Sequence, residues 1–204
     1  MIEEKITIHT QRLILRPYQP CDEEGLFALE QCPQTHCYNY TMPRTRPDIL
    51  QEIKIGQQAR LVLYAGRLEL AVILKQDNRL IGKSGYKEGN LKPDGSVEIY
   101  YSIHPAYWNQ EYGTETARGL IRFGFETIKL HRIYAGATVD NVASWRIMEK
   151  VGMQRESHWR EDRPGPGQWI EGKGYQRTPG AYADGYGYAI LSTDNLPAGR
   201  SPAT

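Results

Sequence analysis

Polar and apolar residues alternate along four stretches in the first half of the chain, and this period-two pattern predicts β-strands. The predicted strands run over Gln11–Tyr18, Arg67–Lys75, Arg79–Tyr86 and Ser96–Ile103. In the last of these, the odd-numbered residues from Val97 to Ile103 are apolar or aromatic and share one face. Glu98, Tyr100 and Ser102 point the other way.

Helical spacing of the apolar residues takes over in the second half. Over Thr114–Leu130 they recur every three or four positions and form one stripe along a predicted helix. We expect a strand over Arg132–Thr138 and then another helix within Asn141–Met153. Gly152 and Met153 fit a Schellman ending of that helix, in which the glycine is left-handed and the next residue packs back.

Two further helices are expected between the first two strands. Asp22 is a candidate N-cap for the first, because an Asp side chain accepts hydrogen bonds from the amides of a helix start. The second is expected to start near Thr45. There Thr45 and Asp48 fit a capping box, and Pro47 suits an early helical position.

The composition changes after Trp159. Residues Arg160–Gly185 are rich in Gly, Pro and aromatic residues, and the strand pattern returns at Tyr186–Leu191. The sequence shows no internal repeat and no second domain. It therefore predicts one α/β (α+β) domain over residues 1–192 and a disordered tail over residues 193–204.

Composition and charge exclude several classes of protein. The 204 residues are 40% apolar and 24% charged, which is ordinary for a globular domain. Lys and Arg number 25 against 24 Asp and Glu, so there is no basic excess for a nucleic-acid partner. No apolar run reaches about 18 residues and the N-terminus lacks a signal-peptide core, so we expect no membrane partner and a cytoplasmic location.

Neither the cysteines nor the common motifs indicate a metal or nucleotide site. Cys21, Cys32 and Cys37 form an odd cluster without a paired C-x-x-C motif, so reduced thiols and no metal are expected. The P-loop, the dinucleotide-binding G-x-G-x-x-G motif and the nucleophile motif G-x-S-x-G are absent from the sequence.

The stretch that most suggests chemistry is Trp108–Thr114, which joins a predicted strand to the longest predicted helix. The first amides of a helix have no acceptor within it, and the helix dipole adds positive charge, so such an end can bind a diphosphate. Every helix has an N-terminus, however, and an ordinary turn capped by Asn109 or Thr114 fits the same residues.

In the order of its segments the chain resembles the GNAT acetyltransferase superfamily, and within it the RimJ/RimL-like group. The matching stretches are TQRLILRPYQPCDEEGLFAL, LIGKSGY, VEIYYSIHPAYWNQEYGTETARGLIRFGFE and HRIYAGATVDNVASWRIMEKVGM. The resemblance implies a mixed, strongly twisted sheet of about 6–7 strands flanked by about 4 helices. It also implies that two central strands, here Ser96–Ile103 and Arg132–Thr138, splay apart.

The resemblance further implies acetyl-CoA as the co-substrate, with its pantetheine arm between the splayed strands. The implied contacts are the backbone of Ser102 and Ile103, the side chains of Asn141 and Ser144, and a diphosphate loop of Trp108, Asn109, Gln110, Glu111, Tyr112, Gly113 and Thr114. Helix capping by short polar side chains is the alternative role for Asn141 and Ser144.

Glu111 departs from the family pattern. The usual loop is Q/R-x-x-G-x-G/A, whereas WNQEYG has Glu111 at the first glycine and keeps Gly113 at the last small position. A carboxylate about 6 Å from a phosphate charge costs roughly 0.7–2.8 kcal/mol at an effective dielectric constant of about 20–80. We therefore expect acetyl-CoA to bind with a smaller margin than usual.

Glu98 and Ser144 are the candidate catalytic residues. Transfer requires a neutral amine, and Glu98 is a candidate base because the family often has an acidic residue at this point of the central strand. A salt bridge across the strands is the equally weighted alternative. Ser144 is expected to hydrogen-bond the leaving sulfur, because Met148 stands where many relatives have a tyrosine.

The sequence thus predicts an N-acetyltransferase that moves an acetyl group from acetyl-CoA to a primary amine by direct attack. The acceptor is expected to be a protein N-terminal α-amine or a small molecule, and the chain a monomer or homodimer. The residues expected to line the acceptor cleft, with simple packing as the alternative, are Tyr38, Tyr40, Trp159 and Trp169. A non-catalytic acyl-CoA-binding domain of the same fold is the alternative function.

Overall fold

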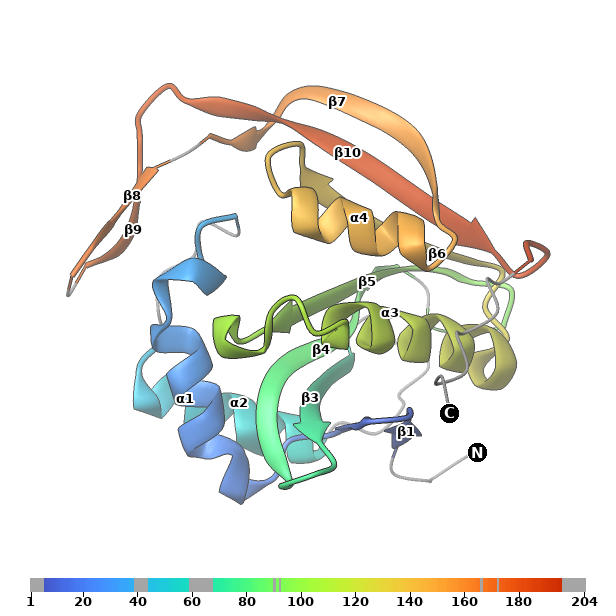
Figure 1. Cartoon of the computed structure of the whole chain (residues 1–204), viewed down its shortest axis with the longest axis horizontal. Coiled ribbons are helices and arrows are strands. Elements are labelled where there is room, and N and C mark those ends of the chain that lie inside the picture. The colour runs from blue at the N-terminus through green and yellow to red at the C-terminus, as the bar shows by residue number, and fades with distance from the viewer. Residues whose placement is uncertain are drawn as a thin grey trace.

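The computed structural model describes residues 6–38, 44–58, 68–89, 91, 93–165, 167–171 and 173–195 (Figure 1). Its strands are β1 (Ile8–His9), β2 (Leu13–Arg16), β3 (Leu68–Leu74), β4 (Arg79–Gly89), β5 (Ser96–Ile103), β6 (Arg132–Thr138), β7 (Gln154–Pro164), β8 (Gly167–Ile170), β9 (Gly174–Arg177) and β10 (Tyr182–Leu191). Its α-helices are α1 (Glu23–Gln31), α2 (Arg46–Gln58), α3 (Tyr112–Phe123) and α4 (Val142–Lys150). Tyr40 and residues 196–204 of the expected tail lie outside the described residues.

Eight strands form one sheet in the order β1-β2-β3-β4-β5-β6-β10-β7, and β8 pairs with β9 in a separate hairpin. Among the described strands of the large sheet, only β5 and β6 are parallel neighbours. They pair over three residues, Ser96–Glu98 against Arg132–Tyr134, and then part. The mixed α/β fold with two splayed central strands is therefore confirmed. The sheet exceeds the expected six or seven strands because β1 and β7 add to both edges.

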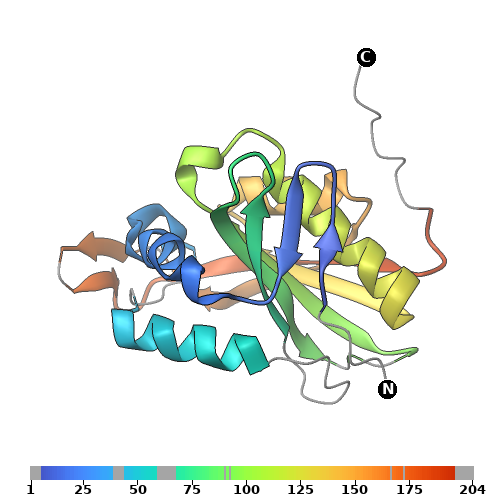
Figure 2. The same ribbon diagram turned by 90° about the horizontal axis from the view of Figure 1, so that it is seen from below.

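Helices cover both faces of the sheet, with α1 and α2 on one side and α3 and α4 on the other (Figures 1 and 2). The alternation of side chains along β3 shows why both layers are needed. Leu70 and Val72 belong to the core under α3, whereas Ala71 and Ile73 belong to the core under α1 and α2. A strand buried on both faces has a continuous apolar run.

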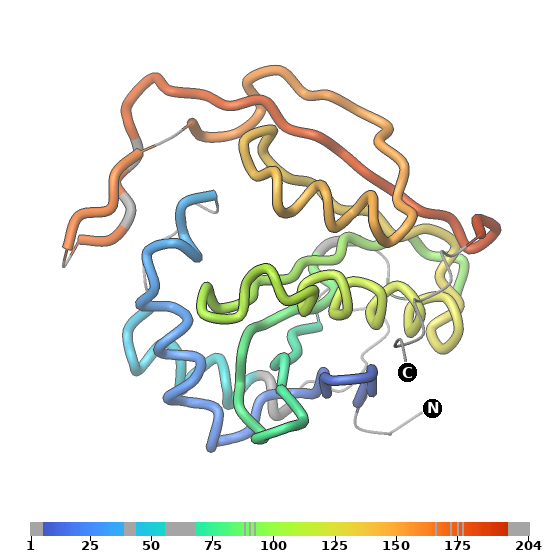
Figure 3. Tube along the Cα trace, in the orientation of Figure 1, coloured from blue at the N-terminus to red at the C-terminus, as the bar shows by residue number. Residues whose placement is uncertain are grey.

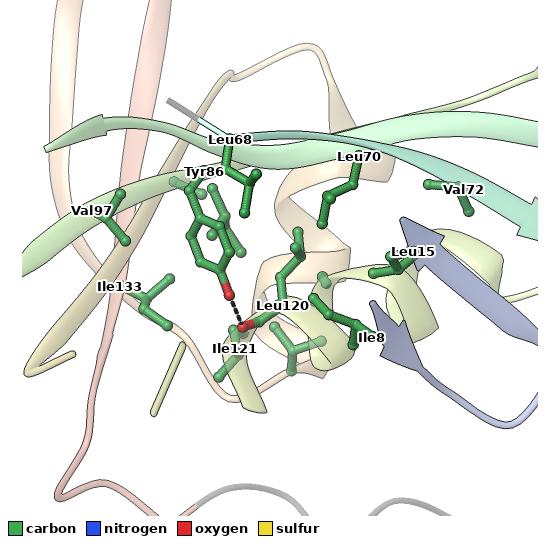
Figure 4. Packing of buried hydrophobic residues seen from close by; sticks show 14 of the residues in the cluster. Ile8, Leu15, Leu68, Leu70, Val72, Tyr86, Val97, Leu120, Ile121 and Ile133 are labelled. Atoms are coloured by element: carbon green, nitrogen blue, oxygen red, sulfur yellow. Dashed lines mark hydrogen bonds between the residues drawn. The ribbon is translucent and has the colours of Figure 1, made fainter. Parts of the chain in front are cut away.

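Tyr86 of β4 links the sheet to α3 through the larger core. Its side chain is fully buried, and its hydroxyl donates a hydrogen bond to the carbonyl of Leu120 at 2.5 Å (Figure 4). Burial raises the pKa of Tyr86, so the hydroxyl stays protonated and able to donate. The bond satisfies a polar atom that would otherwise be costly inside an apolar cluster.

The central helix differs from the expected Thr114–Leu130 at both ends. It begins two residues earlier, at Tyr112, and its α-helical part ends at Phe123, where a π-helical segment, Gly124–Ile128, continues it. A Cβ atom added to Gly124 would lie 2.7 Å from Cδ1 of Ile133. The glycine therefore allows the helix to approach β6 closely.

The expected helix caps have mixed outcomes. The prediction that Asp22 caps α1 is wrong, because its carboxylate binds the guanidinium of Arg16 at 2.7 and 3.0 Å and accepts the amide of Gln19 at 2.7 Å. The capping box before α2 is confirmed. The amide and hydroxyl of Thr45 both donate to the carboxylate of Asp48, at 2.9 and 2.6 Å.

The segment Arg160–Gly185, which was set apart by its composition, carries the end of β7, the β8–β9 hairpin and the start of β10. Most of β7 is exposed, so it has no apolar face that would produce the period-two pattern, and its backbone pairing with β10 holds it. Charged side chains on such an edge strand also discourage pairing with other chains. The β8–β9 hairpin reaches back toward the segment that follows α1 (Figure 3).

Candidate active site

The gap between β5 and β6 opens after Glu98, and the backbone of β5 faces it at every second residue. The amide of His104 donates to the carbonyl of Ile81 in β4 at 2.8 Å. Because backbone groups alternate along a strand, those of Ser102 also face β4, and those of Tyr101 and Ile103 face the gap. Ser102 accordingly lies opposite Lys83 of β4.

The loop that leads from β5 to α3 has the left-handed backbone that suits glycine, although Glu111 stands at the first glycine position of the family pattern. Asn109 and Glu111 both have positive φ, 59° and 63°, in the left-handed region that glycine visits freely. For other residues this conformation costs about 1–2 kcal/mol. Trp108 fixes the loop to the strand, because its indole N–H donates to the carbonyl of Ile103 at 2.6 Å.

The carboxylate of Glu111 is paired rather than bare. The Lys150 ammonium at the end of α4 lies 2.6 Å from it, and both side chains are more than half exposed. Hydrogen bonds from Lys150 and then from Thr114 lower the pKa of Glu111, so it is charged at neutral pH. The nearby cation offsets part of the repulsion expected between Glu111 and a diphosphate.

The first turn of α3 packs tightly against its surroundings while its amides point out of the helix end. Tyr112 and Thr114 are buried. A Cβ atom on Gly113 would lie 2.8 Å from Cδ1 of Ile147, so the small residue allows α3 and α4 to approach. The side-chain amide of Gln110 points back and donates to a carbonyl of the preceding 3₁₀ turn at 3.3 Å.

Glu115 anchors the start of α3 to the N-terminal strands, which the sequence pattern did not reveal. Its carboxylate accepts the Thr10 hydroxyl at 2.6 Å, the Arg12 amide at 2.6 Å and the Arg12 Nε–H at 2.7 Å. Burial opposes the charged form, but these bonds outweigh it and lower the pKa of Glu115. The Arg12 guanidinium also lies 4.2 Å from the centre of the Tyr112 ring.

The start of α4 lies across the gap from β5. The side-chain carbonyl of Asn141 accepts the amide of Ser144 at 3.2 Å, which is the capping role left open above. The Tyr101 hydroxyl donates to the carbonyl of Ser144 at 3.0 Å, and this bridge was not foreseen although Tyr101 was placed on that face. Met148 is buried in the core beneath.

The end of α4 forms the expected Schellman motif. The amide of Met153 donates to the carbonyl of Met148, and that of Gly152 donates to the carbonyl of Glu149, both at 3.0 Å. Gly152 is left-handed, with φ of 91°. This ending fixes the last turn of α4, and with it the Lys150 side chain that meets Glu111.

Glu98 lies at the mouth of the gap, opposite Tyr134 at the last paired position of β5 and β6. Its carboxylate is 2.8 Å from the Lys87 ammonium, and only 14% of its side chain is exposed. The structure thus contains the cross-strand salt bridge that was weighed against catalysis, and the role as base stays a prediction.

A buried ionic cluster lies on the same face of the sheet as Glu98. Glu30 of α1 forms ion pairs with Lys83 of β4 and, at 3.9 Å, with Arg44. Lys83 pairs across the strands with Ser102, which shares a face with Glu98. The carbonyl of Glu30 also meets the His36 ring at 2.6 Å.

Two tryptophans of the C-terminal strands lie on this face as well. Trp159 lies over glycines of β6 and β10, because Cβ atoms on Gly136 and Gly187 would lie 3.4 and 2.5 Å from its ring. Trp169 of β8 stacks obliquely on His36, with the ring centres 5.6 Å apart. Tyr38 is 40% exposed.

The described residues form neither a metal-binding cluster nor a membrane-spanning helix. In the part of the chain that the structure describes, no three His, Cys, Asp or Glu side chains gather in a way that could hold a metal ion. Among the helices formed by those residues, none is long and apolar enough to cross a membrane.

Comparisons with known proteins agree on one family. The family model described as the acetyltransferase (GNAT) domain matches residues 12–154. YnaD of Bacillus subtilis, an uncharacterized N-acetyltransferase, is 31% identical over 123 residues, which are 60% of this chain and 64% of YnaD. A GNAT-family acetyltransferase from Bacillus anthracis aligns with a TM-score of 0.73 and 25% identity, over 93% of this chain and 100% of that one.

A further solved structure shares the fold at lower identity. It is a spermidine N-acetyltransferase from Vibrio cholerae in complex with CoA and spermine, with a TM-score of 0.69 and 21% identity over 89% of this chain and 96% of that one. Since the family model covers more than half of the sequence, and the splayed sheet agrees with it, this chain belongs to the GNAT acetyltransferase family.

Proposed function

We propose that this protein is an acetyl-CoA-dependent N-acetyltransferase of the RimJ/RimL-like kind that acts on a primary amine by direct attack. The observation that carries the proposal is the short pairing of β5 with β6, which opens a gap beside the start of α3. Family membership supports acetyl transfer. The CoA held by the Vibrio cholerae enzyme supports the co-substrate.

The residues around the gap fit acetyl-CoA. Tyr101 and Ile103 turn backbone groups toward the gap, where a pantetheine amide could take the place of a strand partner. The first amides of α3 offer donors for a diphosphate. Asn141 and Ser144 line the far side at the start of α4. Acetyl-CoA would supply the acetyl group as a thioester, and its leaving thiol resembles that of cysteine, which has a pKa of about 8.5.

Glu98 is assigned to proton removal from the acceptor amine. At pH 7 an amine with a pKa of about 10.4 is neutral in about one molecule in 2,500, and an α-amine with a pKa of about 7.8 in about one in seven. A carboxylate at the mouth of the gap can take that proton directly or through one water. The amide of Ile103 is assigned to the negative charge that develops on the acetyl oxygen, and Ser144 to the sulfur.

The acceptor is proposed to lie on the face that carries Glu98, the ionic cluster around Glu30 and the two tryptophans. The spermine bound by the Vibrio cholerae enzyme makes polyamines one class to test. The RimJ/RimL-like resemblance makes protein N-terminal α-amines the other. Trp169 and His36 bring the β8–β9 hairpin to this side, so the hairpin is proposed to shape acceptor choice.

A non-catalytic acyl-CoA-binding domain is the second candidate function. Two observations favour it: Glu98 is already paired with Lys87, and Met148 is a core residue where many relatives have a tyrosine. The two candidates share cofactor binding and differ in turnover.

Two measurements test the proposal. Calorimetric titration of the full chain with CoA is expected to show one binding site, and absence of binding overturns both candidates. Thiol release from acetyl-CoA is then followed with N-terminal peptides, spermidine and aminoglycosides. Turnover on any of these amines supports the transferase, whereas tight CoA binding without turnover on all of them supports the binding domain.

A further inference from the structure

A groove runs along the outer side of α3, away from the gap between β5 and β6. It begins at Glu111 and Thr114, where the candidate diphosphate site lies, and continues to Glu126 and Thr127. The segment Thr7–Arg12, which carries β1 and the turn after it, forms its other wall. The groove encloses about 890 Å³, and no role was assigned to it above.

The groove has more positively charged than negatively charged side chains. Its three carboxylates each have a cation of their own. The pairs are Glu111 with Lys150 at 2.6 Å, Glu115 with Arg12 at 2.7 Å, and Glu126 with Arg122 at 3.0 Å. Arg118 is a fourth cation in the lining, and it forms no ion pair with any residue that the structure describes. The groove therefore keeps one uncompensated positive charge.

Arg118 also keeps a donor that the described protein groups do not satisfy. Its Nε atom is shielded from solvent and has no hydrogen-bond partner among the described residues. The terminal N–H groups of the guanidinium are not shielded in this way, and a guanidinium binds phosphate through such paired N–H groups, so an anion in the groove would neutralise the charge.

The position of Arg118 fits the second phosphate of coenzyme A. Thr114 and Arg118 are four residues apart, so they share one face of α3 and are separated along its axis by about 6 Å. The charge of Arg118 reaches the start of the helix, because it contributes, after Lys150 and Thr114, to the lowered pKa of Glu111. A ligand anchored by its diphosphate at the first turn would extend its next anionic group along this groove.

We propose that Arg118 binds the 3′-phosphate of the adenosine part of coenzyme A in this groove. The inference rests on the proposed function, because it requires the diphosphate to lie at the start of α3. It makes Arg118 a cofactor-binding residue that discriminates coenzyme A from its 3′-dephospho form.

Calorimetric titration of the full chain with CoA and with 3′-dephospho-CoA tests the proposal without any turnover. The unaltered protein is expected to bind CoA at least about tenfold more tightly, since dephospho-CoA lacks the charge-assisted hydrogen bonds to Arg118. In Arg118→Gln the affinity for CoA falls to that for dephospho-CoA, and the affinity for dephospho-CoA is unchanged. Arg118→Lys keeps part of the preference.

Arg122→Gln is the matched control, because Arg122 lines the same groove one turn further along but is already paired with Glu126. It is expected to keep the full preference for CoA. Equal binding of the two ligands by the unaltered protein overturns the inference and leaves the proposed function standing. So does an equal loss for both ligands in Arg118→Gln. Failure of both ligands to bind the unaltered protein overturns the proposed function itself.

Discussion

The two ends of the candidate site are built in different ways. At the cofactor end, ionic side chains tie the start of α3 to its neighbours, with Glu115 held by Thr10 and Arg12, and Glu111 by Lys150. At the acceptor end, the β8–β9 hairpin is a separate two-stranded element. It meets the helical layer where Trp169 stacks on a histidine.

This difference separates stability from specificity. A two-stranded hairpin is marginally stable by itself, so it can change length and sequence without unfolding the sheet. The start of α3 is fixed by a partly buried carboxylate that satisfies three donors, and its loss removes all three bonds together. We therefore expect loss of the Glu115 carboxylate to alter folding and CoA affinity together, and changes in the hairpin to alter acceptor affinity alone.

The largest effect on turnover is expected from Glu98→Gln, at the boundary between the two ends. If Glu98 is the base, kcat at pH 7 falls by about 10²-fold or more, and the pH optimum rises, because transfer then depends on amine that is already neutral. Steady-state kinetics against pH measure both effects. An unshifted profile would leave Glu98 as a salt-bridge partner only.

Lys87→Gln is the control for that experiment. It breaks the same ion pair, at 2.8 Å, but leaves the carboxylate in place. We expect this variant to retain the pH optimum of the unaltered protein. If the two variants lose the same activity with the same profile, the pair acts structurally and the base is elsewhere.

Glu115→Ala is expected to give the largest loss of stability. It leaves the Thr10 hydroxyl and two donors of Arg12 without their acceptor, which costs about 2–3 kcal/mol of unfolding free energy. Denaturant unfolding measures this loss, and CoA affinity should fall with it because the first turn of α3 loosens. A stable variant that binds CoA normally would contradict the view that this end is rigidly tied.

The same carboxylate predicts a pH dependence of stability. Hydrogen bonds lower the pKa of Glu115 in the folded state, so its contribution is present above the unfolded value of about 4.3 and is lost as the pH falls through the folded value. Acid unfolding should therefore be less steep in Glu115→Ala than in the unaltered protein. Parallel curves would show that the carboxylate contributes no pH-linked stability.

Local features of the structure were predicted from the sequence, whereas contacts between distant segments were not. The bounds of β5 and β6 were predicted to the residue, because both strands have one apolar face and end at clear breaks. The Thr45 capping box and the Schellman ending of α4 are local motifs and were confirmed as well. Local patterns thus predicted the scaffold around the gap.

The contacts that join distant segments were not predicted. Glu115 meets Arg12 across 103 positions of the chain, and neither residue has a local signal for the other. The strand β7 is exposed on most of its length, so no apolar face marked it, and the composition of the hairpin favoured turns. The residues at both ends of the site could therefore be placed on elements, but their partners could not be named.

Trp169→Ala is expected to have a moderate effect confined to the acceptor end. Loss of the stacking contact with His36 should free the hairpin and raise the KM for the acceptor about three- to tenfold, in line with a lost aromatic contact of about 0.5–1.5 kcal/mol. The Kd for CoA should stay within about twofold. Steady-state kinetics and calorimetry measure the two constants, and a coupled change in both would contradict the proposed independence of the two ends.

An effect of similar size on binding, but confined to the cofactor end, is expected from Glu111→Gly. The change removes about 1–2 kcal/mol of left-handed strain, but glycine adds backbone entropy to the unfolded chain and an exposed ion pair is lost, so stability should change little. CoA binding should tighten about three- to tenfold, because a negative charge leaves the diphosphate site and Lys150 is freed to face it. Lys150→Ala should act in the opposite direction, since it leaves Glu111 charged and unpaired beside the phosphates. Calorimetric titration of both variants with CoA measures these changes. Weaker or unchanged binding in Glu111→Gly would mean that the carboxylate favours CoA binding by holding Lys150 in place.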